Sequence, residues 1–242
     1  MKKILSISNS FGVDATRYFH GVATSLGEEV KVGTLYIGGC SLERHCQNIA
    51  TNKKEYEYYI NGVFTGEFCS IEDALLSDNW DFIVMQQSSP LSGVQESYFP
   101  YLTDLSNFVK KHAPTAKQFI HQTWAYPENS GMFEYTPFNS REEMITAVQN
   151  AYERAEKSIL ASGIIPCLKA SCYFYEKYGN AFYRDDLHAS LGVGRYLLAC
   201  VWVEALLNKS VLGNTYRDLD EEFSEEQILF AQSCAHKAVW GG

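Results

Sequence analysis

A serine near the start of the chain and a histidine near its end are the first candidates for chemistry. Ser10 follows a short apolar run, and Asp185 and His188 lie three residues apart. A serine hydroxyl becomes a nucleophile when a histidine accepts its proton and a carboxylate orients that histidine. The i, i+3 spacing places Asp185 and His188 on the same side of a turn. Taken alone, these signals also fit a helix-capping serine and an acidic surface turn.

Two further segments carry groups that could stabilise a developing oxyanion. Gly38 and Gly39 follow one apolar run, and Gln86 and Gln87 end the next. Glycines allow the backbone to approach a ligand closely and to present an N–H, and a glutamine amide can donate a hydrogen bond. With the N–H of Ser10, these residues form the candidate oxyanion hole.

Aromatic residues make up 14% of the chain, which is a high share. Trp124 and Tyr126 follow a fourth apolar run that ends near His121, and a second aromatic stretch covers residues 173–183. Aromatic faces beside a cleft suit sugar rings or acyl groups. We therefore take Trp124, Tyr126 and His121 as candidate substrate-binding residues, with core packing as the alternative for these aromatics.

Five apolar runs predict the buried strands that would position these groups, and helical spacing lies between them. Buried strands that alternate with helices indicate a parallel sheet covered on both faces, whose sites lie beyond the carboxyl ends of the strands. Capping boxes begin at Ser140 and Ser224, and a weaker one begins at Ser70. The strands are expected at 3–8, 30–37, 81–86, 118–122 and 164–168, and further helices at 98–112 and 191–207.

One segment departs from this alternation. Residues 55–68 hold two runs rich in aromatic and β-branched residues around Asn61-Gly62. Asn-Gly is the favoured two-residue hairpin turn because both positions need a positive φ. We expect a β-hairpin insertion at the edge or rim of the sheet.

The order of these motifs resembles the SGNH (GDSL-type) hydrolase superfamily. Residues 4–15 are similar to the opening motif of a bacterial branch without an assigned activity, I-L-x-I-G-N-S-F-S-x-D-A. In this chain they read Ile-Leu-Ser-Ile-Ser-Asn-Ser-Phe-Gly-Val-Asp-Ala. Residues 80–89 and the Asp-x-x-His segment followed by Gly-x-Gly-Arg-Tyr-Leu also resemble that branch. The resemblance covers roughly residues 3–207.

The resemblance implies a flavodoxin-like α/β fold of three α/β/α layers, with a five-stranded parallel sheet in the order 2-1-3-4-5. It implies ester hydrolysis through an acyl-enzyme, with Ser10 as nucleophile, His188 as base and Asp185 as its orienting partner. With the aromatics, it indicates an O-acetyl or short-acyl ester of a carbohydrate as substrate. Two departures are visible: Ser8 stands where the family usually has glycine, and glutamine replaces the usual asparagine.

Composition excludes several other classes of protein. The net charge of −9 argues against a nucleic-acid partner. The seven cysteines form no C-x-x-C pair, so we expect reduced thiols in a cytoplasmic protein, no metal and no cofactor. No apolar run reaches the length of a membrane span, and the first residues do not read as a signal peptide, although one could have been removed. A single domain, 1–242, is expected, and a homo-oligomer is left open.

Two other interpretations remain. The chain could be a carbohydrate or small-molecule binding module on the same fold, with weak or lost catalysis. It could also be a nucleotide-binding Rossmann protein, but G-x-G-x-x-G does not follow the first expected strand.

Overall fold

The fold is built around one seven-stranded sheet in the order β4-β3-β2-β1-β5-β6-β7. A computed structural model describes residues 1–241 of the chain. The strands are β1 (Lys2–Ser8), β2 (Val30–Tyr36), β3 (Tyr56–Ile60), β4 (Val63–Cys69), β5 (Phe82–Met85), β6 (Lys117–His121) and β7 (Ile164–Ile165).

The sheet is mixed rather than purely parallel. Its parallel neighbours run in the order β2-β1-β5-β6-β7, while β2, β3 and β4 pair in antiparallel fashion. The five-stranded prediction was therefore wrong in strand number, because the hairpin extends the sheet through pairs such as Leu35 with Tyr58. Its turn is as predicted, with a φ of 52° at Asn61 and 77° at Gly62.

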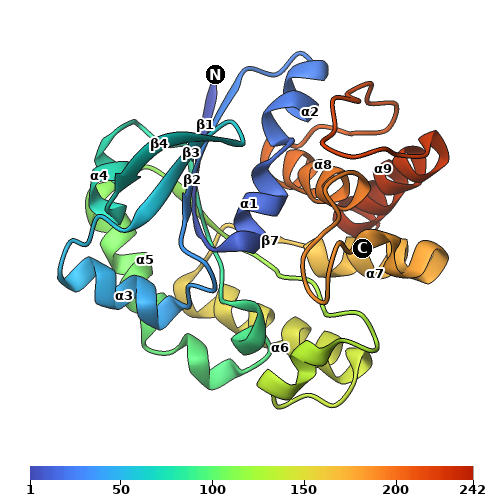
Figure 1. Ribbon diagram of the computed structural model, residues 1–242. Helices are drawn as coiled ribbons and strands as arrows, with labels where there is room; N and C mark the ends of the chain where they lie inside the picture. The colour runs from blue at the N-terminus through green and yellow to red at the C-terminus, as the bar shows by residue number, and fades with distance from the viewer. Residues whose placement is uncertain (242) are drawn as a thin grey trace.

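Helices cover both faces of the sheet (Figure 1). The α1, α2, α7, α8 and α9 helices lie on one side, and α3, α4, α5 and α6 lie on the other. The α-helices are α1 (Ser10–Thr16), α2 (Phe19–Ser25), α3 (Leu42–Ala50), α4 (Ile71–Leu76), α5 (Tyr101–His112), α6 (Arg141–Ile159), α7 (Cys167–Tyr178), α8 (Val193–Leu207) and α9 (Glu225–Trp240). Short 3₁₀ turns are η1 (Ser89–Leu91), η2 (Gln95–Tyr98), η3 (Gly131–Tyr135) and η4 (Gly179–Phe182).

The helix ends follow local side-chain chemistry with some differences from expectation. Ser70 and Asp73 form the complete capping box that begins α4. At α6, Ser140 accepts from the Glu143 N–H, but Glu143 reaches the Asn139 N–H instead of closing the box. Ser224 makes no side-chain cap for α9. The bond from the third helical side chain back to the N-cap N–H therefore depends on the path of the backbone before the helix as well as on the residue types.

The fifth expected strand is much shorter than predicted. Only Ile164 and Ile165 pair with β6, and α7 begins at Cys167, directly after Pro166. Pro166 has no N–H to give to a sheet, and a proline suits the start of a helix. The fold therefore turns from sheet to helix at this proline.

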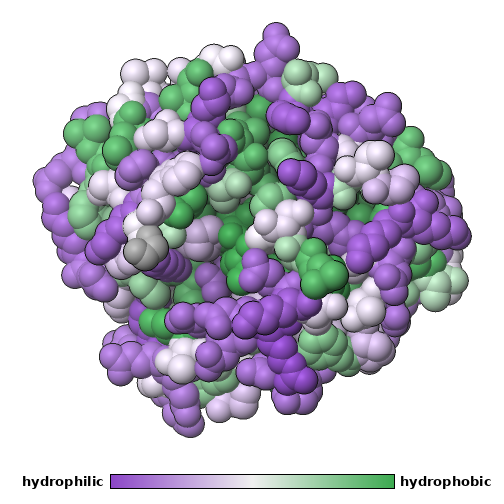
Figure 2. All heavy atoms as spheres, turned by 180° about the vertical axis from the view of Figure 1, so that it is seen from behind, coloured by the Kyte–Doolittle hydropathy of each residue, from purple (hydrophilic) through white to green (hydrophobic). Residues whose placement is uncertain are grey.

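The surface seen from behind mixes hydrophilic and hydrophobic residues across the face (Figure 2). Among the described residues, no helix is both long enough and apolar enough to cross a membrane.

Candidate active site

Three side chains from the two ends of the chain meet at the carboxyl end of β1. The Oγ of Ser10 lies 2.9 Å from Nε2 of His188, and Nδ1 of His188 lies 2.8 Å from Oδ2 of Asp185. Ser10 begins α1, whereas Asp185 and His188 belong to the loop before α8. The structure thus brings Ser10 and His188 together across 178 positions of sequence.

Asp185 is held by its own loop. Its Oδ1 accepts from the backbone N–H of Leu187 at 2.9 Å and of His188 at 2.7 Å. Partial burial opposes its ionisation, but these N–H groups and the His188 ring outweigh it, so the pKa of Asp185 lies below its usual value. The carboxylate is therefore charged at neutral pH and faces the imidazole.

The loop that carries Asp185 and His188 has little regular structure and is fastened by hydrogen bonds from outside. Trp124 Nε1 donates to the Leu187 carbonyl at 2.7 Å. Ser130 Oγ donates to the Asp186 carbonyl at 2.8 Å. These contacts fix one side of the loop against the segment that follows β6.

A chain of buried side chains runs across the sheet beneath Ser10. Asn9 caps α1 by accepting the Phe11 N–H, and its amide donates to the Cys40 carbonyl at 3.0 Å. Gln86 Nε2 donates to Asn9 Oδ1 at 2.5 Å, and Gln86 Oε1 lies 2.7 Å from His121 Nδ1. This chain links β6, β5, the cap of α1 and the turn after β2.

The turn after β2 presents free backbone donors. Gly39 has a φ of 60°, and the Cys40 N–H closes the turn on the Ile37 carbonyl. Within the described residues, the N–H groups of Gly38, Gly39 and Ser10 donate to no protein acceptor. A positive φ at Gly39 favours glycine over any residue with a side chain.

These groups surround a cavity of about 270 Å³. Sequence reasoning placed Ser10, His188, Gly38 and Gly39 in the site, and all four line this cavity. Several other lining residues were not predicted. Ser89 could have been predicted, because it follows the same strand end as Gln86. The remaining lining residues are Asn9, Tyr36, Ser89, Pro90, Met132 and Leu187.

The two predicted glutamine donors do not reach the cavity. Gln86 gives its amide to Asn9, as described above. Gln87 is fully buried, accepts from the Leu42 N–H at 3.0 Å and donates to Ser97. Each amide already bonds to neighbouring protein groups, and neither glutamine is among the residues that line the cavity.

The predicted substrate-binding residues are also placed differently. His121, Trp124 and Tyr126 are fully buried beneath the site. Trp124 stacks on Phe11 with ring centroids 3.9 Å apart, and burial lowers the pKa of His121 to about 3. The stretch 173–183 forms the second half of α7 and the η4 turn, and it contributes no residue to this cavity. These residues support the site and do not touch its interior.

Tyr126 nevertheless reaches a residue that does line the cavity. Its hydroxyl donates to Ser89 Oγ at 2.9 Å, which leaves the Ser89 proton free to donate elsewhere. Burial raises the pKa of Tyr126 to about 12, so this hydroxyl remains protonated and continues to donate. Ser89 is thus an oriented hydroxyl donor at the cavity wall.

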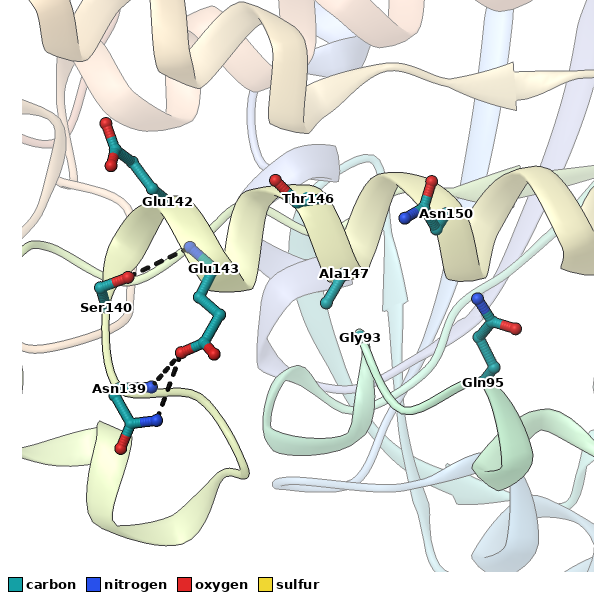
Figure 3. Close-up of a pocket in the computed structure, with 9 residues that line it drawn as sticks. All are labelled: Gly93, Gln95, Asn139, Ser140, Glu142, Glu143, Thr146, Ala147 and Asn150. Atoms are coloured by element: carbon teal, nitrogen blue, oxygen red, sulfur yellow. Dashed lines mark hydrogen bonds between the residues drawn. The ribbon is translucent and has the colours of Figure 1, made fainter.

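A larger hollow of the surface lies elsewhere and lacks this chemistry. It measures about 850 Å³ and lies between Gly93 and the first half of α6 (Figure 3). Glu143 is bonded to Asn139, and Ser140 serves as the helix cap. Its lining residues pair no nucleophile with a base, so the smaller cavity at Ser10 is the candidate site.

Neither a metal cluster nor an activated thiol is found in the part of the chain that the structure describes. No group of three or more potential ligands is present there. Cys40, next to the glycine turn, is buried, and burial raises its pKa to about 12. A neutral thiol of this kind is a poor nucleophile.

Comparison with known proteins identifies relatives of the whole chain. A family model described as a domain of unknown function, DUF4886, matches residues 3–238. The crystal structure of a DUF4886 family protein from Bacteroides uniformis ATCC 8492 has a TM-score of 0.89 and 34% identity, covering 98% of this chain and 94% of that one. None of the curated proteins matches this chain in sequence.

More distant structures share the architecture. A protein from Slackia heliotrinireducens assigned as an SGNH hydrolase has a TM-score of 0.60 and 24% identity, over 84% of this chain and 97% of that one. A protein from Parabacteroides merdae ATCC 43184 assigned as a GDSL-like lipase has a TM-score of 0.56 and 11% identity, over 86% and 96%. At these identities the likeness establishes the fold: the chain has the SGNH hydrolase fold.

Proposed function

This chain belongs to the DUF4886 family, and we propose that it is a serine hydrolase of small carboxylic esters. The observation that carries the proposal is the continuous contact from Ser10 Oγ through the His188 ring to the Asp185 carboxylate, at the wall of a cavity. The SGNH fold supports it, because proteins assigned to that superfamily as hydrolases and lipases share this architecture.

The geometry supports an acyl-transfer mechanism. Neutral His188 takes the Ser10 proton on Nε2 as Ser10 Oγ attacks the ester carbonyl carbon. The Asp185 carboxylate accepts a hydrogen bond from the Nδ1–H of His188, which fixes the tautomer of the ring and stabilises the imidazolium that forms. His188 then protonates the leaving alkoxide, and an acyl-enzyme remains on Ser10. Water activated by His188 attacks this ester and regenerates Ser10.

The oxyanion formed in each step needs donors in the cavity. We assign the backbone N–H of Ser10 and that of Gly38 or Gly39, because these groups have no protein acceptor. We assign the Ser89 hydroxyl as the third donor, in the place expected for a glutamine. Ser89 Oγ accepts the Tyr126 hydroxyl, so its own proton is available for the oxyanion. A well-aimed donor of this kind contributes about 3–4 kcal/mol to transition-state stabilisation.

The cavity supports a short acyl group as the preferred substrate. Its volume of about 270 Å³ is small, and Pro90, Met132 and Leu187 supply apolar surface. Small pockets of this kind exclude long chains by sterics and bind short ones by burial of apolar area.

A row of aromatic side chains that begins at the cavity wall supports a sugar as the alcohol part of the ester. Tyr36 lines the cavity and meets Tyr59 edge-on at 6.2 Å, and Tyr59 meets Phe64, which is 41% exposed. Exposed aromatic faces bind the apolar faces of sugar rings. Trp124 and Tyr126 are buried and take no part in this proposal.

The proposal is tested with a panel of p-nitrophenyl esters from acetate to decanoate and with O-acetylated sugars. The wild-type protein should hydrolyse acetate and butyrate, lose activity with longer acyl chains and release acetate from sugars. Ser10→Ala should lose at least 10³-fold in kcat, about the loss expected for a triad nucleophile. Full activity in Ser10→Ala would overturn the mechanism. Binding of sugars without turnover by the wild type would indicate a binding module instead.

A further inference from the structure

A buried carboxylate one helical turn after Ser10 takes no part in the mechanism above. Asp14 lies on the inner face of α1, and its side chain is 1% exposed. Arg184 Nη1 lies 2.9 Å from Oδ1 and 3.0 Å from Oδ2 of Asp14. Arg195 Nε donates to Asp14 Oδ1 at 2.8 Å. A carboxylate this deeply buried is retained only with strong partners, and both partners flank the His188 loop.

Arg184 has a second carboxylate within reach. Its neighbour in the chain is Asp185, and Arg184 Nε lies 4.0 Å from Asp185 Oδ2. That oxygen is the one that lies 2.8 Å from His188 Nδ1. Arg184 and His188 are therefore potential competitors for the same acceptor, and guanidinium groups prefer to bind carboxylates closely and in a planar, two-point arrangement.

The contacts of Arg184 show which carboxylate it now binds. Nη1 binds both oxygens of Asp14 and also donates to the Ala189 carbonyl, whereas Asp185 is approached only by Nε, at the longest ion-pair distance. Asp14 thus holds the guanidinium on the α1 side of the loop. Without Asp14, Asp185 would be the nearest remaining carboxylate that the same side chain contacts.

We propose that Asp14 is a positioning residue that keeps Arg184 away from Asp185, so that Asp185 Oδ2 remains bound to His188 Nδ1. This inference rests on the proposed function, because it assumes that the Asp185–His188 contact matters for turnover. It assigns to Asp14 an effect on the chemical step and none on substrate binding, since neither Asp14 nor Arg184 lines the cavity.

The test compares four variants on p-nitrophenyl acetate with the folded state checked by circular dichroism. Asp14→Asn removes the carboxylate and should lower kcat at least tenfold, with KM within a factor of two. Arg184→Gln removes the competitor and should keep at least a third of wild-type kcat. The double variant Asp14→Asn/Arg184→Gln should recover to the level of Arg184→Gln. Arg195→Gln removes the other partner of Asp14 and serves as the matched control, with little change in kcat.

Proton NMR gives a readout that a purely structural role would not move. The low-field resonance of the His188 Nδ1 proton in its bond to Asp185 should be present in wild type and in Arg184→Gln. It should be lost in Asp14→Asn and return in the double variant.

Several outcomes would overturn the inference. If Asp14 does not act through Arg184, the kcat of the double variant will be no higher than that of Asp14→Asn. A kcat of Asp14→Asn equal to that of Arg195→Gln would also contradict the proposal. If Asp14→Asn does not fold, Arg184→Gln and the double variant decide, and loss of activity in both would contradict the proposal. An inactive wild-type protein would instead point to failure of the proposed function.

Discussion

Ser8 and Gly12 share one space beneath the start of α1. A Cβ placed on Gly12 would lie 2.3 Å from the Cβ and 2.1 Å from the Oγ of Ser8. In the branch that the opening motif resembles, glycine stands at position 8 and serine at position 12. Ser8 and Gly12 both differ from that motif, and the two differences compensate each other in volume, because the missing side chain of Gly12 leaves room for that of Ser8.

Gly12→Ala should destabilise the protein because its methyl group collides with Ser8 in a closely packed helix–sheet contact. Overpacking of this kind costs about 1–3 kcal/mol of unfolding free energy. Urea denaturation of the variant and the wild type measures the loss.

Ser8→Gly in the same chain should relieve most of that loss. Ser8→Gly alone gives up the hydrogen bond to the Leu35 carbonyl, of 3.0 Å, and should cost about 1 kcal/mol. A double variant whose loss of unfolding free energy equals or exceeds the sum of the two single losses would contradict the shared space.

Ser89→Ala should lower kcat while KM changes little. The variant removes the hydroxyl that we assign to the oxyanion, so the loss should be about 10²-fold. Tyr126→Phe leaves that hydroxyl in place but frees it to rotate, and its effect on kcat should be smaller. Steady-state kinetics on p-nitrophenyl acetate separates the two. Equal and full activity in both variants would remove Ser89 from the mechanism.

Trp124→Phe tests whether Trp124 supports the site or binds substrate. Phenylalanine keeps much of the stacking on Phe11 but loses the hydrogen bond to the Leu187 carbonyl, so the His188 loop is held less well. Misplacement of catalytic groups should lower kcat by about tenfold, with KM for small esters unchanged. A raised KM with unchanged kcat would return Trp124 to the role of a substrate-binding residue.

His121 should make the stability of the protein depend on pH. Its pKa in the folded state is about 3, against an ordinary 6.5. Between these values the unfolded chain binds a proton that the native state excludes, so the free energy of unfolding rises with pH by about 1.4 kcal/mol per unit. This contribution is complete above pH 6.5 and is lost as the pH falls.

His121→Asn keeps a donor toward Gln86 but removes the titration, so the slope between pH 6.5 and 4.5 should be smaller in urea denaturation. His45 has a similarly lowered pKa from burial, and His45→Asn should reduce the slope by a similar amount. An unchanged slope in a folded His121→Asn variant would contradict this account.

The positions of residues that directly follow a strand could be predicted from the sequence. Ser10 and the Gly38–Gly39 turn follow directly from buried strands, whose carboxyl ends meet at one edge of a parallel sheet. Asp185 and His188 were predicted from their i, i+3 spacing together with the resemblance of the Asp-x-x-His segment to the SGNH superfamily. Predictions from strand ends and from short spacings hold in the folded structure because they depend on few neighbouring residues.

Side-chain direction was harder to predict, since it depends on partners distant in sequence. Gln86 and Gln87 do end a strand, but Asn9 in one case and Leu42 and Ser97 in the other take their amides. Trp124 bonds to a carbonyl 63 residues away, which no local pattern indicates. The cavity residue Met132 comes from a 3₁₀ turn in a segment that has no strand or long helix to mark it.

The most direct test of the account is reaction of the wild-type protein with a fluorophosphonate, followed by mass spectrometry of the intact chain and its peptides. We predict a single adduct on Ser10, absent in Ser10→Ala and formed much more slowly in His188→Gln. An active protein whose adduct lies on another residue, or a folded protein that forms no adduct at Ser10, would contradict the assignment of Ser10 as the nucleophile.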